Sequence, residues 1–312
     1  MVWIRETCYK FNILRSYKIK TKIISVGNLT FGGTGKTPTV DFLIQNLKQN
    51  KKIAVISRGY GRKTKGFFKV NPWVDDAPII FGDEPVQLAA KHPDVSFYVC
   101  EDRVRGCEEI EKEKAFDLII ADDAFQHLRL RRDLDIVVVD ASEEIKNYRY
   151  PPLGRARNSL SYLKRADYVF LTKTNLSQKQ DYEWIKAQLR NCKVIEFESK
   201  VDGIYDLHSN DPIANPIREA SLVSGIGKPK TFEKILIDQG IAVREHFVYR
   251  DHHNYSEADL RKIKGVMQGG TLLTTEKDAV KIRNISKDLK VGVVRLKLVN
   301  TNSVGRLYED IH

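Results

Sequence analysis

The sequence of 312 residues lacks the features that define several protein classes. Its four cysteines, Cys8, Cys100, Cys107 and Cys192, include no C-x-x-C pair, so no cysteine-based metal or redox site is supported. We expect free thiols in a reducing cytoplasm. No apolar run approaches the length that crosses a bilayer, and no signal peptide is recognisable at the start. There is also no internal repeat and no low-complexity segment.

The composition is that of a soluble globular protein, with 42% hydrophobic and 30% charged residues. The length is sufficient for two domains, each with its own core. A formal net charge of +11 indicates nucleic acid, an anionic membrane surface or a polyanionic substrate as a partner. A basic solvated face without any partner is equally compatible with the charge. Because no recognised nucleic-acid module is present, we expect no nucleic acid.

The first 22 residues are basic and amphipathic. They contain six Lys or Arg residues and one Glu, interleaved with apolar side chains that include Trp3, Ile4 and Phe11. Such a segment can lie on an anionic bilayer surface. It can equally pack on the folded domain, and the sequence favours neither alternative.

A glycine-rich stretch lies between an expected strand and an expected helix. Residues 22–26 read KIISV, a short run typical of a buried parallel strand. Residues 36–50, which read KTPTVDFLIQNLKQN, have apolar residues at helical spacing, and Pro38 suits the first turn. The glycines between them, Gly32, Gly33 and Gly35, therefore precede a helix N-terminus, where backbone N–H groups bind anions.

This stretch resembles a phosphate-binding loop but departs from its strict pattern. G-x-x-x-x-G-K-[ST] requires a glycine six places before the lysine, and that position is Thr30. We interpret the segment as a variant loop, because strand, glycines, Lys-Thr and helix occur in the required order. Lys36 would reach the β- and γ-phosphates, and the Thr37 hydroxyl would bind Mg²⁺. The alternative is a structural turn whose lysine points to solvent.

Further strands are expected within residues 52–63, which become polar from Arg58 on, and at 95–100, 116–123, 134–140 and 166–173, with helical patterns between most of them. This alternation predicts a doubly wound, mostly parallel α/β sheet. Residues 200–218 are rich in Gly, Asn, Asp and Pro, as linkers are. A second βα set follows. The predicted organisation is a basic segment at 1–22, a phosphate-loop domain at 23–200, a linker at 201–218 and a smaller α/β domain at 219–312.

Acidic residues occur near this predicted nucleotide site. Asp122 and Asp123 end an apolar strand, where phosphate-loop enzymes hold Mg²⁺; the alternative is that both cap the next segment. Asp83 precedes Glu84 and a helical pattern, and its position alone favours a helix N-cap. A carboxylate there could instead accept the proton of an attacking hydroxyl.

Histidines and arginines form two other candidate groups. Asp251, His252 and His253 lie in a loop before a helix that Ser256 and Asp259 would cap. A proton-relay histidine is a better functional interpretation there than a metal site, and an exposed loop histidine is an equal alternative. Arginines are dense at residues 149–165 and at 103–105, which suits a phosphorylated substrate or a solvated basic face.

The motifs together resemble the tetraacyldisaccharide 4'-kinase family, the lipid A 4'-kinases of Gram-negative bacteria. They occur in order over nearly the whole chain from about residue 21, and they read ISVGNLTFGGTGKTP, SRGYGRK, GDEP, EDR, DDAFQH, RDLDIVVVD, LKRADYVFLTK, DHHNYS and TTEKDAVK. Thr30 in place of glycine is itself the form found in this family.

The resemblance implies an ATP- and Mg²⁺-dependent kinase, peripheral on the cytoplasmic face of the inner membrane. It would phosphorylate the 4'-hydroxyl of tetraacyldisaccharide 1-phosphate, and two α/β domains joined by a short β linker would close around the site. The resemblance also implies roles for individual residues. These are Asp83 with His252 as the base, Lys36 as a catalytic residue, Gly32, Gly33, Thr34, Gly35, Lys36, Thr37 and Gln126 at the nucleotide, Thr37, Glu84, Asp122 and Asp123 at the metal, and Arg103 and Arg157 at the substrate.

Three departures from the family pattern are visible. Asp-Asp-Ala replaces the usual Asp-Asp-Gly at Ala124. Asn158 and Ser159 follow Arg157 where the family usually has Glu-Pro, so a carboxylate is lost. Only about twenty residues precede the first strand, which predicts a weaker grip on the membrane. The rival hypothesis is a phosphate-loop regulatory ATPase or GTPase that acts through a protein partner.

Overall fold

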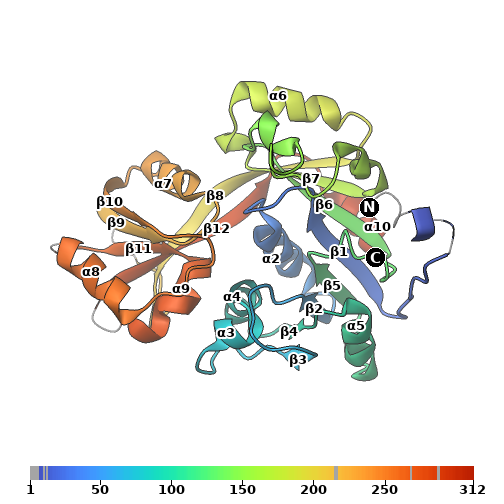
Figure 1. Cartoon of the computed structure of the whole chain (residues 1–312), viewed down its shortest axis with the longest axis horizontal. Coiled ribbons are helices and arrows are strands. Elements are labelled where there is room, and N and C mark those ends of the chain that lie inside the picture. Colours follow the sequence, from blue (N-terminus) through green and yellow to red (C-terminus); the bar gives the residue numbers. More distant parts are fainter. Residues whose placement is uncertain (1–6, 10, 12, 214–216, 268, 287–288) are drawn as a thin grey trace. The chain divides into compact units, whose positions relative to one another are not determined.

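The computed structural model describes residues 7–9, 11, 13–213, 217–267, 269–286 and 289–312. It divides the chain into two compact units, of which the first comprises Met1–Glu198 and Leu298–His312 and the second comprises Ser199–Lys297. Both units contain strands and helices (Figure 1), which confirms the predicted α/β class. Most of the predicted basic segment, including Trp3 and Ile4, lies outside the described residues.

The first unit contains a mostly parallel sheet, as predicted. Within its described residues the strand order is β8-β7-β6-β1-β5-β2-β4-β3. All neighbours pair in parallel except β3 and β4, which are antiparallel. The strands are β1 (Lys22–Asn28), β2 (Ile53–Ser57), β3 (Phe68–Lys69), β4 (Ser96–Val99), β5 (Leu118–Asp122), β6 (Leu134–Asp140), β7 (Tyr168–Thr172) and β8 (Val194–Asp206). Every residue of β2, β5, β6 and β7 is buried, as expected for parallel strands covered on both faces.

Helices follow the strands of this unit. They are α2 (Lys36–Leu47), α3 (Ala77–Phe81), α4 (Asp83–Lys91), α5 (Arg103–Lys112), α6 (Lys179–Gln188) and α10 (Gly305–Ile311), with short 3₁₀ helices η1 (Ile145–Tyr148), η2 (Leu160–Arg165) and η3 (Thr174–Leu176). The segment between β2 and α4 contains β3 and α3, which the hydrophobic pattern did not predict.

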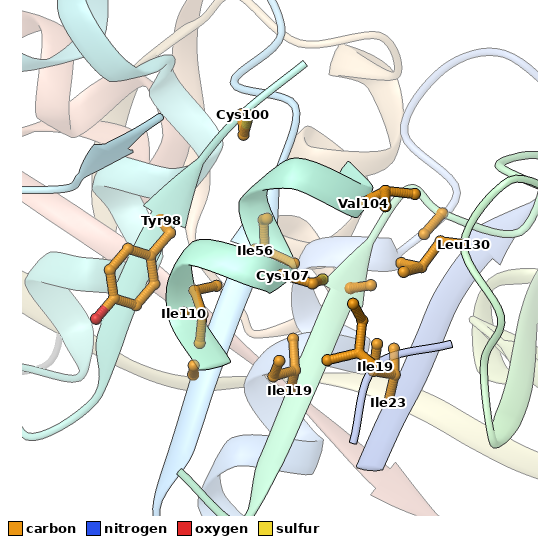
Figure 2. Close-up of a cluster of buried hydrophobic side chains, with 13 residues drawn as sticks. Ile19, Ile23, Ile56, Tyr98, Cys100, Val104, Cys107, Ile110, Ile119 and Leu130 are labelled. Atoms are coloured by element: carbon orange, nitrogen blue, oxygen red, sulfur yellow. The ribbon is translucent and has the colours of Figure 1, made fainter. Parts of the chain in front are cut away.

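The core beneath α5 shows how helix periodicity produces the packing. Cys107 and Ile110 are buried at a spacing of three residues, so they lie on one face of the helix. Figure 2 shows this face turned towards Ile56 of β2 and Ile119 of β5, with which it forms one buried cluster. The helix begins after Asp102, whose side chain accepts hydrogen bonds from two backbone N–H groups of the first turn.

The second unit is a smaller parallel α/β fold. In its described residues the strands lie in the order β10-β9-β11-β12. Its elements are β9 (Glu219–Ser224), α7 (Pro229–Asp238), β10 (Ala242–Val248), α8 (Glu257–Met267), β11 (Leu272–Thr275), α9 (Glu276–Ile282), η4 (Arg283–Ile285) and β12 (Val291–Asn300). Ser256 and Asp259 exchange backbone and side-chain hydrogen bonds at the start of α8, which confirms the predicted capping box.

The last residues of the chain do not belong to the smaller domain that was predicted at 219–312. Residues 298–312 belong to the first unit, where Tyr168 donates a hydrogen bond to Asp310 (2.6 Å) and Lys22 donates to the Asp310 carbonyl (3.0 Å). The strand β8 also extends to Asp206, into the predicted linker. A hydrophobic pattern shows that a strand or helix exists but does not show which sheet it joins.

Among the described residues, no helix combines the length and apolar character that crossing a membrane requires.

Candidate phosphate-loop kinase site

The glycine-rich loop joins β1 to the N-terminus of α2. Gly35 is the N-cap residue, with φ of 97°, and Lys36 and Thr37 are the first two helical residues. The φ of 97° favours glycine here, and a side chain would in addition bring its Cβ to 3.1 Å from the Thr172 hydroxyl, a tight contact. Lys36 and Thr37 therefore stand where the helix dipole and backbone N–H groups favour a phosphate.

The start of the loop explains why Thr30 can replace the usual glycine. Thr30 pairs with Ala156 in an antiparallel bridge, an extended conformation that any residue adopts. The buried Asn28 side chain donates to the Thr30 carbonyl (2.6 Å) and to the Thr34 hydroxyl (2.8 Å). The variant loop thus begins as a continuation of strand structure, and its departure from the strict pattern has a physical basis.

Two residues at the end of β7 hold the carbonyl groups of the loop, and sequence reasoning missed both. Lys173 donates from Nζ to the Gly33 carbonyl and to Asp140 Oδ2, each at 2.7 Å. Thr172 donates to the Thr34 carbonyl at 3.1 Å. Two successive carbonyls are therefore turned towards β7, which suits a loop whose N–H groups must face an anion. The available signal was an Asp and a Lys at the same ends of the adjacent parallel strands β6 and β7.

Asp123 connects the lysine of the loop to an arginine. Its Oδ1 atom lies 3.6 Å from Lys36 Nζ and 2.8 Å from Arg157 Nη1. Burial alone would raise the pKa of Asp123, but the charges of Lys36 and Arg157 hold it below its usual value. The Arg157 guanidinium also lies 4.8 Å from the centre of the Phe31 ring. Asp123 is thus engaged by two cations, and its carboxylate orients both of them beside the loop.

Asp122 ends β5, directly beside β1, and has the properties of a cation ligand. The residue is 5% exposed, and its Oδ1 atom is buried without a hydrogen-bond partner in the described part of the chain. Burial, followed by the negative charge of Glu84, raises the pKa of Asp122 to about 7. A divalent cation would coordinate this oxygen and would offset both the burial of the carboxylate and the repulsion from Glu84. Asp122 therefore fits the Mg²⁺ ion that phosphate loops use.

The donor set is that of magnesium bound mainly to phosphate. Within the described residues there is no group of three His, Cys, Asp or Glu side chains that could hold a metal alone. Mg²⁺ is commonly bound by one or two carboxylates together with substrate phosphates and water. Asp122, Glu84 and the Thr37 hydroxyl match that requirement, and Asp123, which the sequence also predicts at the metal, makes ion pairs with Lys36 and Arg157.

Arg103 and Gln126 stabilise the same region from inside. Arg103 is buried, and its guanidinium donates to the Asp123 carbonyl at 3.1 Å. Gln126 donates from Nε2 to the Asn28 carbonyl (2.6 Å) and to Asn158 Oδ1 (3.0 Å). Asn158 is therefore an acceptor for Gln126. The side chains of Arg103 and Gln126 therefore point into the protein, where they position the loop and the end of β5.

Asp83 is buried at the start of α4. It is not the N-cap that its position in the sequence favours: Gly82 occupies that position with φ of 92°, and Asp83 is the first helical residue. The other end of α4 is anchored to α2, where Asp41 accepts hydrogen bonds from Lys91 (2.9 Å) and pairs with His92 (2.6 Å). The helix that carries Asp83 and the helix that begins at Lys36 are therefore joined by buried charges.

His252 belongs to the second unit. It occupies a turn after β10 with φ of 61°, and its backbone N–H donates to the Gly225 carbonyl at 3.1 Å. Lys277 Nζ lies 3.1 Å from His252 Nε2 and 3.0 Å from Asp251 Oδ1. These contacts fix the ring within its own unit. His253 is separate from them, because it stacks on Tyr249 and lies 3.3 Å from Asp259.

Comparisons with known proteins point to one family. The family model described as tetraacyldisaccharide-1-P 4'-kinase matches residues 1–309. A tetraacyldisaccharide 4'-kinase of Bdellovibrio bacteriovorus is 35% identical over 320 residues, which cover 100% of this chain and 94% of that relative. The corresponding protein of Elusimicrobium minutum is 32% identical, with 99% and 86% covered.

A solved structure gives the same result in three dimensions. LpxK from Aquifex aeolicus, crystallised in complex with ATP, has a TM-score of 0.82 and 29% identity to this chain. The match covers 99% of this chain and 93% of that structure. Because the family model matches residues 1–309 and relatives above 30% identity cover nearly the whole chain, the chain belongs to the tetraacyldisaccharide 4'-kinase family.

Proposed function

We propose that this protein transfers the γ-phosphoryl group of ATP to the 4'-hydroxyl of tetraacyldisaccharide 1-phosphate, a step of lipid A biosynthesis. Membership of the family supports the reaction and the acceptor. One structural observation carries the phosphoryl-transfer chemistry: the phosphate loop on β1 lies next to the partnerless carboxylate oxygen of Asp122 on the neighbouring strand β5. This pair of features provides for a nucleotide and its metal together.

The proposed roles follow from the geometry. Lys36 would bind the β- and γ-phosphates, and Thr37, Glu84 and Asp122 would hold the metal. Mg²⁺, when bound, neutralises charge that develops on the transferring group. Asp123 would keep Lys36 aimed at the phosphates, because the two side chains are paired.

The arginines are proposed to serve the phosphates of nucleotide and substrate. Arg157 has a side chain that is 24% exposed, so it can exchange its contact with Asp123 for a phosphate oxygen. Arg103 is buried and would contribute its positive charge from behind the Asp123 backbone. Gln126 would hold the loop in position for the nucleotide through Asn28.

Asp83 is proposed as the base that accepts the proton of the attacking hydroxyl, with His252 as its partner. This assignment is supported by the family resemblance of their motifs. Asp83→Ala should lower kcat strongly while ATP binding persists, because the base is needed only when the hydroxyl attacks. Unchanged turnover of the variant would exclude Asp83 as the base.

We also propose that the protein works as a peripheral enzyme on the cytoplasmic face of the inner membrane. The acceptor of the family carries four acyl chains, and the net charge of +11 favours an anionic lipid surface.

The experiment that tests the function measures ADP release with and without detergent-dispersed tetraacyldisaccharide 1-phosphate. A kinase should release ADP in proportion to the phosphorylated lipid, and little ADP when the acceptor is omitted. The same rate with and without the acceptor would instead support a regulatory ATPase that acts through a protein partner.

A further inference from the structure

An exposed turn with an apolar tip adjoins the phosphate loop. Residues 149–153, which read RYPPL, are all exposed. The exposed fraction is 55% for Tyr150 and 73% for Leu153. Isolated apolar side chains are common on protein surfaces, but a continuous Tyr-Pro-Pro-Leu tip is not explained in that way. We call residues 149–155 the apolar turn.

The apolar turn is held by its own backbone. Gly154 N–H donates to the Tyr150 carbonyl (3.2 Å), and Ala156 N–H donates to the Arg149 carbonyl (2.9 Å). A Cβ atom at Gly154 would lie 2.3 Å from the Arg149 carbonyl oxygen, so only glycine permits this closure. The exposure of Tyr150 and Leu153 is therefore a property of a well-bonded turn and not of a loosely packed segment.

The turn is also bonded to the phosphate loop. Phe31 N–H donates to the Arg155 carbonyl and Arg157 N–H donates to the Leu29 carbonyl, both at 2.7 Å. Phe31, within the loop itself, is 48% exposed. Because backbone hydrogen bonds join the two segments, whatever fixes the apolar turn also fixes the position of the loop.

We propose that the apolar turn inserts into the interfacial layer of an anionic bilayer and thereby brings the phosphate loop to the level of the acceptor's sugar. Tyr150 suits the interface and Leu153 the acyl region. Arg149, which is exposed at the start of the tip, would attract anionic headgroups. The inference rests on the proposed function, because a lipid acceptor presents its hydroxyl at the membrane surface.

The first experiment measures binding of the full chain to vesicles with and without phosphatidylglycerol, in the absence of ATP and acceptor. Leu153→Asp places a charge in the inserted tip and should weaken binding to the anionic vesicles about tenfold or more. Ile237→Asp is the matched control, because Ile237 lies on α7 of the second unit and is 52% exposed. Equal binding by the two variants would overturn the proposal.

A second variant reports insertion without adding a charge. Leu153→Trp keeps the tip apolar, and its additional fluorescence should be quenched by vesicles of brominated lipid. The tryptophan fluorescence of the unmodified chain gives the background. If the added fluorescence of the tryptophan at position 153 is not quenched, insertion of the turn is refuted. Trp73 is also exposed, by 62%, so loss of binding in Trp73→Ser but not in Leu153→Asp would transfer the membrane contact to that segment and overturn the assignment.

A kinetic comparison separates this proposal from the proposed function. Phosphorylation is measured with the acceptor in vesicles and in detergent micelles. Leu153→Asp should reduce the rate on vesicles by a larger factor than the rate in micelles. Equal factors would contradict a membrane role for the turn. Failure of the unmodified chain to phosphorylate the lipid would refute the kinase assignment alone, because vesicle binding is measured independently.

Discussion

Replacing Lys173 tests whether β7 shapes the phosphate loop. Lys173 Nζ makes two contacts at 2.7 Å, one with the Gly33 carbonyl and one with Asp140. The Lys173 side chain is 14% exposed and that of Asp140 is fully buried. Lys173→Met should therefore destabilise the protein by about 3–5 kcal/mol, because a buried carboxylate loses its cationic partner and keeps only the hydrogen bonds from neutral groups such as Ser142.

The effect on the nucleotide is separate from the effect on folding. Losing a hydrogen bond from a charged donor to the Gly33 carbonyl removes about 1.5–3 kcal/mol, so ATP should bind about 10- to 100-fold more weakly. In the double variant Lys173→Met with Asp140→Asn, the buried negative charge is absent as well. We expect this variant to recover part of the stability but not the affinity.

Isothermal titration with ATP, ADP and AMP, together with thermal melts, would distinguish the two effects. The loop is expected to bind the β- and γ-phosphates, so the affinity for ATP and ADP should fall while that for AMP changes little. Lys186→Met is the control, since it removes a surface pair with Glu196 (2.9 Å) in which Lys186 is 45% exposed. Unchanged ATP affinity in the double variant, or an equal loss for all three nucleotides, would refute the reasoning.

Two further predictions concern stability. Gly35→Ala should lower the melting temperature and weaken ATP binding, because φ is 97° and the new Cβ would meet Thr172. Gly33→Ala is the control, because a Cβ atom at Gly33 would have no neighbour within 4 Å. An equal loss of melting temperature in both variants would contradict the argument. Burial, followed by the charge of Arg103, lowers the pKa of His127 from 6.5 to about 4. The unfolded chain then binds a proton that the folded chain does not, so stability should fall, by about 1–2 kcal/mol after allowance for partial exposure, as the pH decreases from about 6.5 towards 4. Thermal melts at both ends of that range should show a smaller loss in His127→Gln, and an identical loss would disprove the assignment.

The main features of the nucleotide site were predictable from local sequence. A β-branched run, glycines, Lys36-Thr37 and a helical pattern follow one another, and each is specified by residues close in the chain. Asp122 was predicted at the same edge because it ends a strand of the same parallel sheet. These features depend on short-range periodicity and on the rule that ligands bind at the carboxyl ends of parallel strands.

Contacts between distant segments were not predictable in the same way. Lys173 reaches Gly33 across 140 positions of the chain; the position of Lys173 near Asp140 at the ends of adjacent strands does not indicate the contact with Gly33. The return of residues 298–312 to the first unit depends likewise on Asp310 meeting Tyr168. The N-cap at α4 was misplaced because the hydrogen-bonding residue Asp83 is a favoured cap, whereas the backbone conformation at Gly82 decides where the helix begins.

The most direct test of the account is a mass-spectrometric acceptor assay. The purified protein is incubated with ATP, Mg²⁺ and dispersed tetraacyldisaccharide 1-phosphate, and Lys36→Ala serves as the control because it removes the charge of the phosphate loop. We predict a lipid heavier by one phosphoryl group, with fragmentation that places it on the 4' position, and no such product from the control. Consumption of ATP without any phosphorylated lipid would contradict the assignment as a lipid kinase.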